Sequence, residues 1–146
     1  MKQRIKSICL IKHDQEILFS VGNDPKKGTV FLIPIGGGVE FQELASDAVI
    51  REVNEELGVV IANPVLIDIF ENIFCWNGIE GHEIIFCYLA IVEHKHLVPA
   101  FRNESNGEKF ELKWLDRKSI ENLEIPIYPE RLMDIIRRDD KVWRTD

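Results

Sequence analysis

The chain has 146 residues, of which 45% are apolar and 29% are charged, and its formal net charge is −7. This length suits one domain, so we expect residues 1–146 to fold as a single domain without disulfide bonds. The composition excludes disordered, collagen-like and coiled-coil proteins, and the negative charge works against binding to nucleic acids or anionic lipids.

The cysteines and the apolar segments together indicate a cytoplasmic protein. No CxxC spacing occurs and the cysteines cannot all pair within the chain, which is typical of a reducing compartment; they are Cys9, Cys75 and Cys87. The apolar part of the N-terminal segment stops at Lys12, far short of a signal-peptide core. The longest apolar run, residues 84–92, is too short to span a bilayer and predicts a buried strand. We therefore expect no membrane partner.

The first half of the chain predicts strands followed by one helix. Strands are predicted over residues 4–12, 17–21 and 29–34, and the first two form a hairpin. The third strand runs directly into a glycine triplet, and Pro34 marks its end. A helix is predicted from about Leu44 to Leu57, where Gly and Pro are absent, with Gly58 as its left-handed C-terminal cap.

The second half predicts three more strands and a final helix. Two long β-rich segments, residues 64–76 and 82–93, are separated by the turn signal NGIEG and are expected to pair. The polar residues 93–108 are interpreted as a loop that covers a site. A strand over 109–115 and a helix over 129–140 follow. This order predicts an α/β fold in which helices pack on a mixed sheet.

The first predicted helix has an unusual distribution of charge. Successive side chains lie about 100° apart around a helix. This spacing puts Glu52, Glu55 and Glu56 in one sector, separate from a core-facing stripe and a solvated stripe. The core-facing stripe is Val49, Ile50, Val53 and Leu57. The solvated stripe is Asp47, Arg51 and Asn54.

These glutamates have no lysine four residues away, so we expect them to lack ion-pair support and to repel one another. A hard divalent cation such as Mg²⁺ or Mn²⁺ would neutralise them. The alternative is an ordinary glutamate-rich surface helix.

The glycines at positions 36–38 also have two interpretations. They could only form a turn, or their bare backbone could approach phosphates or a metal ion closely. Neither the GxxxxGK[ST] nor the GxGxxG phosphate-loop motif occurs. A phosphate group would therefore be bound mainly through a metal ion.

Residues 37–59, GGVEFQELASDAVIREVNEELGV, resemble the signature of the Nudix hydrolases, G-x5-E-x7-R-E-U-x-E-E-x-G-U with U aliphatic. All nine specified positions match: Gly37, Glu43, Arg51, Glu52, Val53, Glu55, Glu56, Gly58 and Val59. One departure precedes the signature, where the PGGG of the family reads PIGGG with Ile35 inserted. The resemblance implies the family's α/β/α sandwich with a mixed β-sheet.

The resemblance also implies a role for each matching residue. Glu52, Glu55 and Glu56 would bind Mg²⁺ or Mn²⁺, helped by the backbone at positions 36–38, that is Gly36, Gly37 and Gly38. Glu43 and Arg51 would form an ion pair that fixes the loop against the helix and aims the metal ligands. Glu55 or Glu56 would also be the candidate general base, and Gly58 would end the helix.

The implied reaction is hydrolysis of a diphosphate linkage in a nucleoside diphosphate joined to another group, such as a nucleotide, a nucleotide sugar or a dinucleotide. An additional carboxylate often contributes in the family, and the candidates are Glu83, Glu104, Glu108 and Glu111. Trp76 could stack on the base of the substrate or pack in the core.

Two alternatives stay open at this point. One is a nucleotide-sensing Nudix domain without turnover, although such domains tend to lose glutamates that this chain keeps. The other is removal of pyrophosphate from RNA 5′ ends, which the net charge of −7 does not favour. The resemblance also allows a homodimer.

Overall fold

The computed structural model describes residues 2–138 and residue 143. Its elements are, in chain order, β1 (Gln3–His13), β2 (Glu16–Asp24), β3 (Thr29–Ile33), β4 (Ile35–Gly38), α1 (Ala45–Leu57), β5 (Val65–Trp76), β6 (Ile79–Ile91), the 3-10 helix η1 (Lys95–Leu97), β7 (Phe101–Asn103), β8 (Lys109–Asp116), the 3-10 helix η2 (Ile120–Asn122) and α2 (Arg131–Arg137).

The strands of the described chain form a mixed sheet in the order β5-β6-β1-β2-β8-β7, with β3 paired to β2 and β4 paired to β1. Strands β1 and β6 run parallel along Gln3–Lys12, whereas β1 pairs antiparallel with β2 and β4. The middle of β1, Lys6 to Cys9, pairs with β4 and its last residues pair with β2, so β1 connects the two parts of the sheet. The glycine-containing strand therefore lies beside the middle of the fold.

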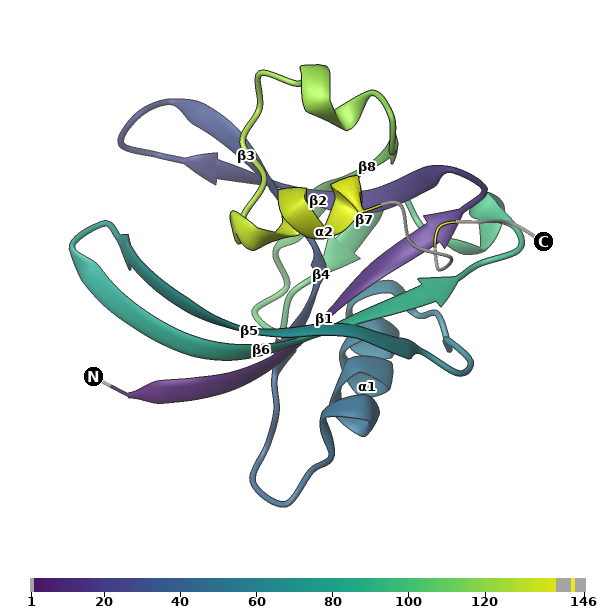
Figure 1. Cartoon of the computed structure of the whole chain (residues 1–146), viewed down its shortest axis with the longest axis horizontal. Helices are drawn as coiled ribbons and strands as arrows, with labels where there is room; N and C mark the ends of the chain where they lie inside the picture. Colours follow the sequence, from purple (N-terminus) through teal and green to yellow (C-terminus); the bar gives the residue numbers. More distant parts are fainter. Residues whose placement is uncertain (1, 139–142, 144–146) are drawn as a thin grey trace.

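Two helices cover opposite faces of this sheet in the described residues (Figure 1). Successive strand residues point to opposite faces, so β1 contributes Ile8 and Leu10 to one core and Cys9 and Ile11 to the other. The first core is closed by α2 through Leu132, Ile135 and Ile136, and the second by α1 through Val49, Val53 and Leu57. The predicted α/β/α sandwich is confirmed.

Several predicted elements are confirmed with small changes of boundary. The first hairpin pairs Ile11 with Leu18, and β5 pairs with β6 from Val65 to Trp76, with a register shift after Leu66. Leu44 is the N-cap of α1 and Gly58 is its left-handed C-cap, with φ 70°. The final helix, predicted over residues 129–140, spans Arg131–Arg137; positions 139 and 140 of that prediction lie outside the described residues.

One of the two interpretations of the glycines and the prediction of one long loop were wrong. The glycines at positions 36–38 are not a turn, because they belong to β4 and pair with Lys6, Ser7 and Ile8 of β1. The interval 93–108 is not one long loop, because it contains η1 and the strand β7, which pairs with β8 through Arg102 and Phe110. Both strands were missed because they are short and lack the apolar alternation from which strands are recognised.

Candidate active site

Strand β4 brings bare backbone against the middle of α1. A Cβ atom added to Gly37 would lie 2.4–2.6 Å from the carboxylate atoms of Glu52, and one added to Gly36 would lie 2.2 Å from the carbonyl oxygen of Ser7. Real Cβ atoms do not approach other atoms so closely. Glycine therefore permits β4 to pack between β1 and α1, with the Glu52 side chain lying against the Gly37 backbone.

The segment between β4 and α1 is held by backbone hydrogen bonds and by Glu43. The Glu43 N–H donates to the Glu40 carbonyl at 3.0 Å, and the Glu40 N–H donates back to Glu43 Oε1 at 3.0 Å. The Ser7 hydroxyl donates to the Ala45 carbonyl at 2.8 Å, which ties β1 to the first turn of the helix. These bonds fix the position of Glu43 before the helix begins.

Arg51 is the hub of an ion-pair network that links this segment, β4 and α1. Its Nε and Nη2 donate to the two carboxylate oxygens of Glu43 at 2.8 and 2.9 Å, and Nη2 also donates to the Gly38 carbonyl at 3.0 Å. Its Nη1 donates to Glu52 Oε1 at 2.9 Å and lies 3.3 Å from Glu55 Oε2. The predicted Glu43–Arg51 pair is thus present.

The same network corrects two expectations about the helix surface. Arg51 does not point freely into solvent, because three carboxylates enclose it and leave its side chain about one quarter exposed. Glu52 and Glu55 do not lack ion-pair support, because Arg51, rather than a lysine, lies one residue before Glu52 and four residues before Glu55. The Arg51 guanidinium holds the pKa of Glu43 at about 2, mainly by hydrogen bonding to its charged form.

Glu56 is in a different environment from Glu52 and Glu55. These three glutamates are the proposed metal ligands of the signature at residues 37–59, which we call the glutamate box. Glu56 is buried on α1 together with Val53 and Leu57, whereas the Glu55 side chain is mostly exposed. Burial raises the pKa of Glu56 to about 8, with smaller increases from the negative charges of Glu52 and Glu104. Glu56 therefore holds a proton near neutral pH.

The cations Arg102 and Lys6 oppose that rise in the pKa of Glu56. Arg102 comes from β7 and is itself buried; its Nε donates to the Ser20 hydroxyl at 2.6 Å, and it forms an ion pair with Glu104. Its guanidinium also lies 4.3 Å from the centre of the Phe110 ring.

Sequence reasoning missed Arg102, although one signal was available. The Asn106–Gly107 dipeptide lies between two segments that can pair, which is a hairpin signal, and β7 and β8 pair on its two sides.

The additional carboxylate candidates lie in different places. Glu104 is the one whose charge acts on Glu56, through the β7–β8 hairpin. Glu108 hydrogen-bonds to Asn106 in the turn of that hairpin, and Glu111 is exposed on β8. Glu83 is buried on β6, where its register partner on β1 is Arg4. Glu104 is therefore the best placed of the four to act with the box.

Trp76 lies apart from the glutamates. It ends β5 at the tip of the β5–β6 hairpin, which projects away from α1 (Figure 1). Its ring packs edge-on against Phe31 of β3 at a centroid distance of 5.2 Å, and Phe31 in turn contacts Tyr128. Its side chain is about one third exposed, so the contact with a base that was predicted for it stays a prediction.

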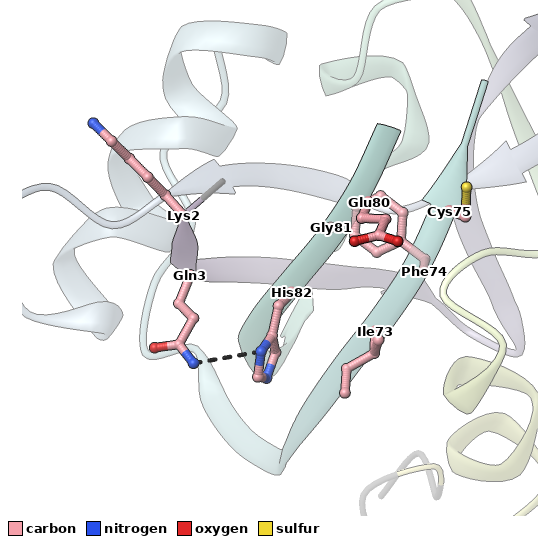
Figure 2. Close-up of a pocket in the computed structure, with 8 residues that line it drawn as sticks. All are labelled: Lys2, Gln3, Ile73, Phe74, Cys75, Glu80, Gly81 and His82. Carbon is pink, nitrogen blue, oxygen red and sulfur yellow. Dashed lines mark hydrogen bonds between the residues drawn. The ribbon is translucent and has the colours of Figure 1, made fainter. Parts of the chain in front are cut away.

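A pocket of about 600 Å³ opens along the same hairpin, at the start of β1 (Figure 2). His82 lies in it, with Nε2 3.1 Å from Glu71 Oε2 and Nδ1 3.4 Å from Gln3 Nε2. The pocket is lined by Lys2, Gln3, Ile73, Phe74, Cys75, Glu80, Gly81 and His82. No residue of the glutamate box lines it, so it is separate from the candidate active site.

The donors around β4 fit a hard divalent cation in their chemistry. Glu52, Glu55 and Glu56 offer carboxylate oxygens beside bare glycine backbone, and a cation would relieve the cost of ionising the buried Glu56. No group of three or more His, Cys, Asp or Glu side chains within residues 2–138 and 143 already has a metal-ligating arrangement. Arg51 instead holds the Glu52 and Glu55 carboxylates, so a bound cation would compete with this guanidinium for their oxygens.

A mixed sheet between two helices, with a glycine strand that abuts a glutamate-rich helix, defines a hydrolase of the Nudix class. The family model for the NUDIX domain matches residues 1–134, and the chain belongs to this family. Nudix hydrolases act on the pyrophosphate bonds of small molecules. Neither helix of the described residues is long and apolar enough to cross a membrane.

Individual relatives agree with this assignment. An uncharacterized Nudix hydrolase, YvcI of Bacillus subtilis (strain 168), is 27% identical over 136 residues, which cover 93% of this chain and 80% of the relative. The crystal structure of a MutT NUDIX hydrolase from Burkholderia pseudomallei has 23% identity and a TM-score of 0.63, with 93% of this chain and 96% of that chain covered.

A further similar structure contains a ligand. It is the NUDIX domain of Shewanella oneidensis NrtR complexed with ADP ribose, with 15% identity and a TM-score of 0.61, covering 93% of this chain and 85% of that one.

Proposed function

We propose that this chain is a pyrophosphohydrolase that depends on Mg²⁺ or Mn²⁺ and cleaves the diphosphate linkage of a small nucleotide-type substrate. The observation that carries the proposal is the division of the box into two parts. Glu43 and Arg51 form a charged clamp, whereas Glu56 is buried close by with a pKa of about 8. An acidic surface helix with no catalytic role does not need such a buried carboxylate.

Glu52, Glu55 and Glu56 would hold the cation, together with the backbone of Gly37. When bound, a divalent cation neutralises diphosphate oxygens and lowers the pKa of a coordinated water. Arg51 would release Glu52 and Glu55 toward the cation while it keeps its bonds to Glu43 and the Gly38 carbonyl. The clamp would then hold α1 against β4 while the two ligand side chains change partner.

Glu56 is our candidate to accept a proton in this site. Its raised pKa belongs to the metal-free protein, and a cation bound beside it would favour the ionised carboxylate, which is the form that accepts a proton. In the proposed reaction the oxygen of water bonds to phosphorus and the bond from phosphorus to the bridging oxygen breaks. The proton of the water passes to the Glu56 carboxylate, and the phosphate that leaves carries the electron pair.

We also propose that the enzyme acts in the cytoplasm, as a single catalytic domain. Cys9, Cys75 and Cys87 are free thiols, and two of them are buried in the core, which suits a reducing cytoplasm. Residues 1–146 would act as one catalytic domain, in line with the family match over residues 1–134. A homodimer remains part of the proposal as the frequent state of the family.

The test is a substrate panel read by product identity. Purified protein with Mg²⁺ or Mn²⁺ is incubated with nucleoside triphosphates, nucleotide sugars, dinucleotides, ADP-ribose and a 5′-triphosphorylated oligonucleotide. We expect phosphate, pyrophosphate or a nucleoside monophosphate to be released from at least one small nucleotide and to require the metal.

Glu55→Gln supplies the blank for this panel, and Glu40→Gln supplies the matched control. Glu40 is an exposed glutamate in the same segment whose side chain has no proposed role. The proposal fails if no member of the panel is cleaved, or if Glu55→Gln is as active as the wild type. Cleavage of the oligonucleotide alone would transfer the assignment to RNA 5′ ends.

A further inference from the structure

The β5–β6 hairpin has an edge that no other described strand covers. Strand β5 pairs with β6 alone among the described strands, and the hairpin extends past both helices (Figure 1). About half of the large apolar side chains that are exposed in the described residues lie on these two strands, among them Ile69, Ile73 and Ile79. The edge is therefore apolar as well as unpaired.

The turn of the hairpin identifies the backbone groups that point away from β6. Asn77 and Gly78 both have positive φ, 51° and 79°, and Trp76 pairs with Ile79 across them. In a hairpin with such a two-residue turn the closing pair is hydrogen-bonded, and bonded pairs then alternate along the strands. The register is regular from Trp76 back to Asp68. The outward-pointing N–H and C=O groups therefore belong to Ile69, Glu71, Ile73 and Cys75.

Only one end of this edge is closed in the described chain. Asp68 Oδ1 accepts the Ile69 N–H at 3.0 Å, and Arg138 Nη1 donates to the Ile67 carbonyl at 3.3 Å. From the Ile69 carbonyl to Cys75, the outward groups have no hydrogen-bond partner among the described residues. We call residues 69–75 the open segment; at about 3.3 Å per residue it is about 23 Å long.

The open segment lacks the residues that protect sheet edges. Natural edge strands are often protected by lysine or proline, and the open segment, IFENIFC, contains neither. Its one charged residue is Glu71, which lies 3.1 Å from His82 of the neighbouring strand β6. Ile69 and Ile73, on either side of Glu71, are 51% and 74% exposed. An edge of this kind is a template for pairing with another strand.

The open segment is complementary to a second copy of itself. Two copies that pair antiparallel along all of residues 69–75 place a two-fold axis at Asn72, the middle residue of the segment. Phe70 then lies opposite Phe74 of the second copy, and aromatic pairs across strands are favourable. Glu71 lies opposite Ile73 of the second copy, so the two carboxylates are not directly opposed, as they would be with the axis at Glu71.

We propose that two copies of this chain form a dimer through the β5 edge, with their open segments joined antiparallel about Asn72 into one continuous sheet. The inference does not depend on the proposed reaction, because the glutamate box is on α1 and not on β5. It assigns a surface to the homodimer. A strand pair of this length is small beside specific interfaces of about 1,200–2,000 Å², so we expect a dimer Kd of about 1–100 μM.

The first experiment changes the charge at position 73 and measures the dimer Kd by sedimentation equilibrium. Ile73→Glu puts a carboxylate opposite Glu71 of the other copy, once on each side of the axis, so Kd should rise at least about tenfold. Ile73→Lys puts an ammonium there and should leave Kd equal or lower. The matched control is Ile79→Glu, because Ile79 is 69% exposed but lies outside the open segment; its Kd should equal that of the wild type. Near-UV circular dichroism checks that each variant is folded.

The second experiment tests the register with the native Cys75. In the proposed dimer Cys75 lies opposite Ile69 of the second copy, where bonded residues have Cα atoms about 5.5 Å apart, within the range of a disulfide. Ile69→Cys oxidised with diamide should therefore give a covalent dimer on a non-reducing gel, and adding Cys75→Ser should abolish it. The wild type should not cross-link, since its two Cys75 thiols would be about 20 Å apart along the strands and its other cysteines are buried.

The outcomes separate this inference from the proposed function. A wild type that stays monomeric at concentrations well above 100 μM would overturn the dimer. Equal Kd values for Ile73→Glu and Ile79→Glu, or no cross-link in Ile69→Cys, would also overturn it, because the contact would then lie elsewhere. An active monomer would leave the proposed function in force, whereas a dimer that cross-links as expected but cleaves no nucleotide would overturn the proposed function alone.

Discussion

Glu43 and Glu56 have the same side chain, and an arginine acts on each of them. At neutral pH, however, Glu43 is ionised and Glu56 is mostly protonated. Glu43 receives two direct hydrogen bonds from Arg51, which hold its pKa at about 2. Burial raises the pKa of Glu56 to about 8, and Arg102, the cation that opposes this rise most, is bonded to Ser20 and Glu104 instead. Direct bonding makes the first carboxylate a permanent anion, whereas burial makes the second a group that exchanges a proton near neutral pH.

This difference gives the two regions different tasks. The clamp region, which comprises Glu43, Arg51 and the Gly38 carbonyl, connects β4 to α1 and is suited to positioning. The Glu56 region comprises Glu56, Arg102 and Glu104. It lies where α1 meets the β7–β8 hairpin and is suited to proton transfer. Variants of each region should therefore differ in kind and in size.

The largest effect is expected from Glu56→Gln, which keeps the shape of the side chain and removes its ability to accept a proton. We expect kcat to fall by about 10²–10⁴-fold, the usual contribution of general acid–base catalysis. Steady-state kinetics on the best substrate measures it, with Glu40→Gln as the control. A loss below tenfold would show that Glu56 is not the base and would shift attention to Glu55 or Glu104.

A smaller loss is expected when the clamp is opened. Arg51→Ala leaves Glu43 without its partner and frees Glu52 and Glu55 together, so we expect activity to fall by about 10–100-fold, as for groups that orient metal ligands. Arg51→Lys keeps the charge but cannot bond to both Glu43 oxygens and Gly38 at once, so it should recover only part of the activity. Full activity in Arg51→Ala would remove the distinction between the two regions.

Much of the clamp could be predicted from the sequence, because it is encoded within 23 contiguous residues. The spacing of Glu52, Glu55 and Glu56 follows from helix geometry, and the Glu43–Arg51 pair followed from the family resemblance. The position of Gly58 as the helix cap followed from its freedom to adopt positive φ, and the structure confirms it at 70°.

The Glu56 region could not be predicted in the same way. Helix geometry put Glu55 and Glu56 in one sector, and it could not tell which would be buried. That depends on packing against distant elements such as β7, which contacts α1 and carries Arg102 about 45 residues later in the chain. That strand has three residues and no apolar alternation, so its signal is weaker than that of the polar loop around it. Long-range packing, rather than local pattern, sets the pKa of Glu56.

The glycines of β4 allow the clamp to be altered without a change of charge. In Gly37→Ala the new methyl group meets the flexible end of Glu52, so we expect about tenfold lower activity with little loss of thermal stability. In Gly36→Ala it meets the Ser7 carbonyl and the Ile8 Cα, which cannot move aside, so unfolding should become easier by about 1–3 kcal/mol. Thermal melts and kinetics on both variants decide this, and equal melting temperatures would contradict it.

The smallest effect is a pH dependence of stability that has opposite signs in the two regions. Between pH 4.5 and about 8 the folded protein keeps a proton on Glu56 that the unfolded chain has lost, so the metal-free protein should become less stable as the pH rises through this range. Stability from Glu43, whose pKa is depressed, is present above pH 4.5 and is lost as the pH falls toward 2.

We expect the melting temperature of the metal-free wild type to fall by about 5 °C between pH 5 and pH 8, and Glu56→Gln to remove most of that fall. Mg²⁺ binds the ionised carboxylates, so it should raise the melting temperature more at pH 8 than at pH 6. Scanning calorimetry in matched buffers measures both effects. A fall of the same size in Glu56→Gln would place the titrating group elsewhere, and the contrast between Glu43 and Glu56 would then rest on their contacts alone.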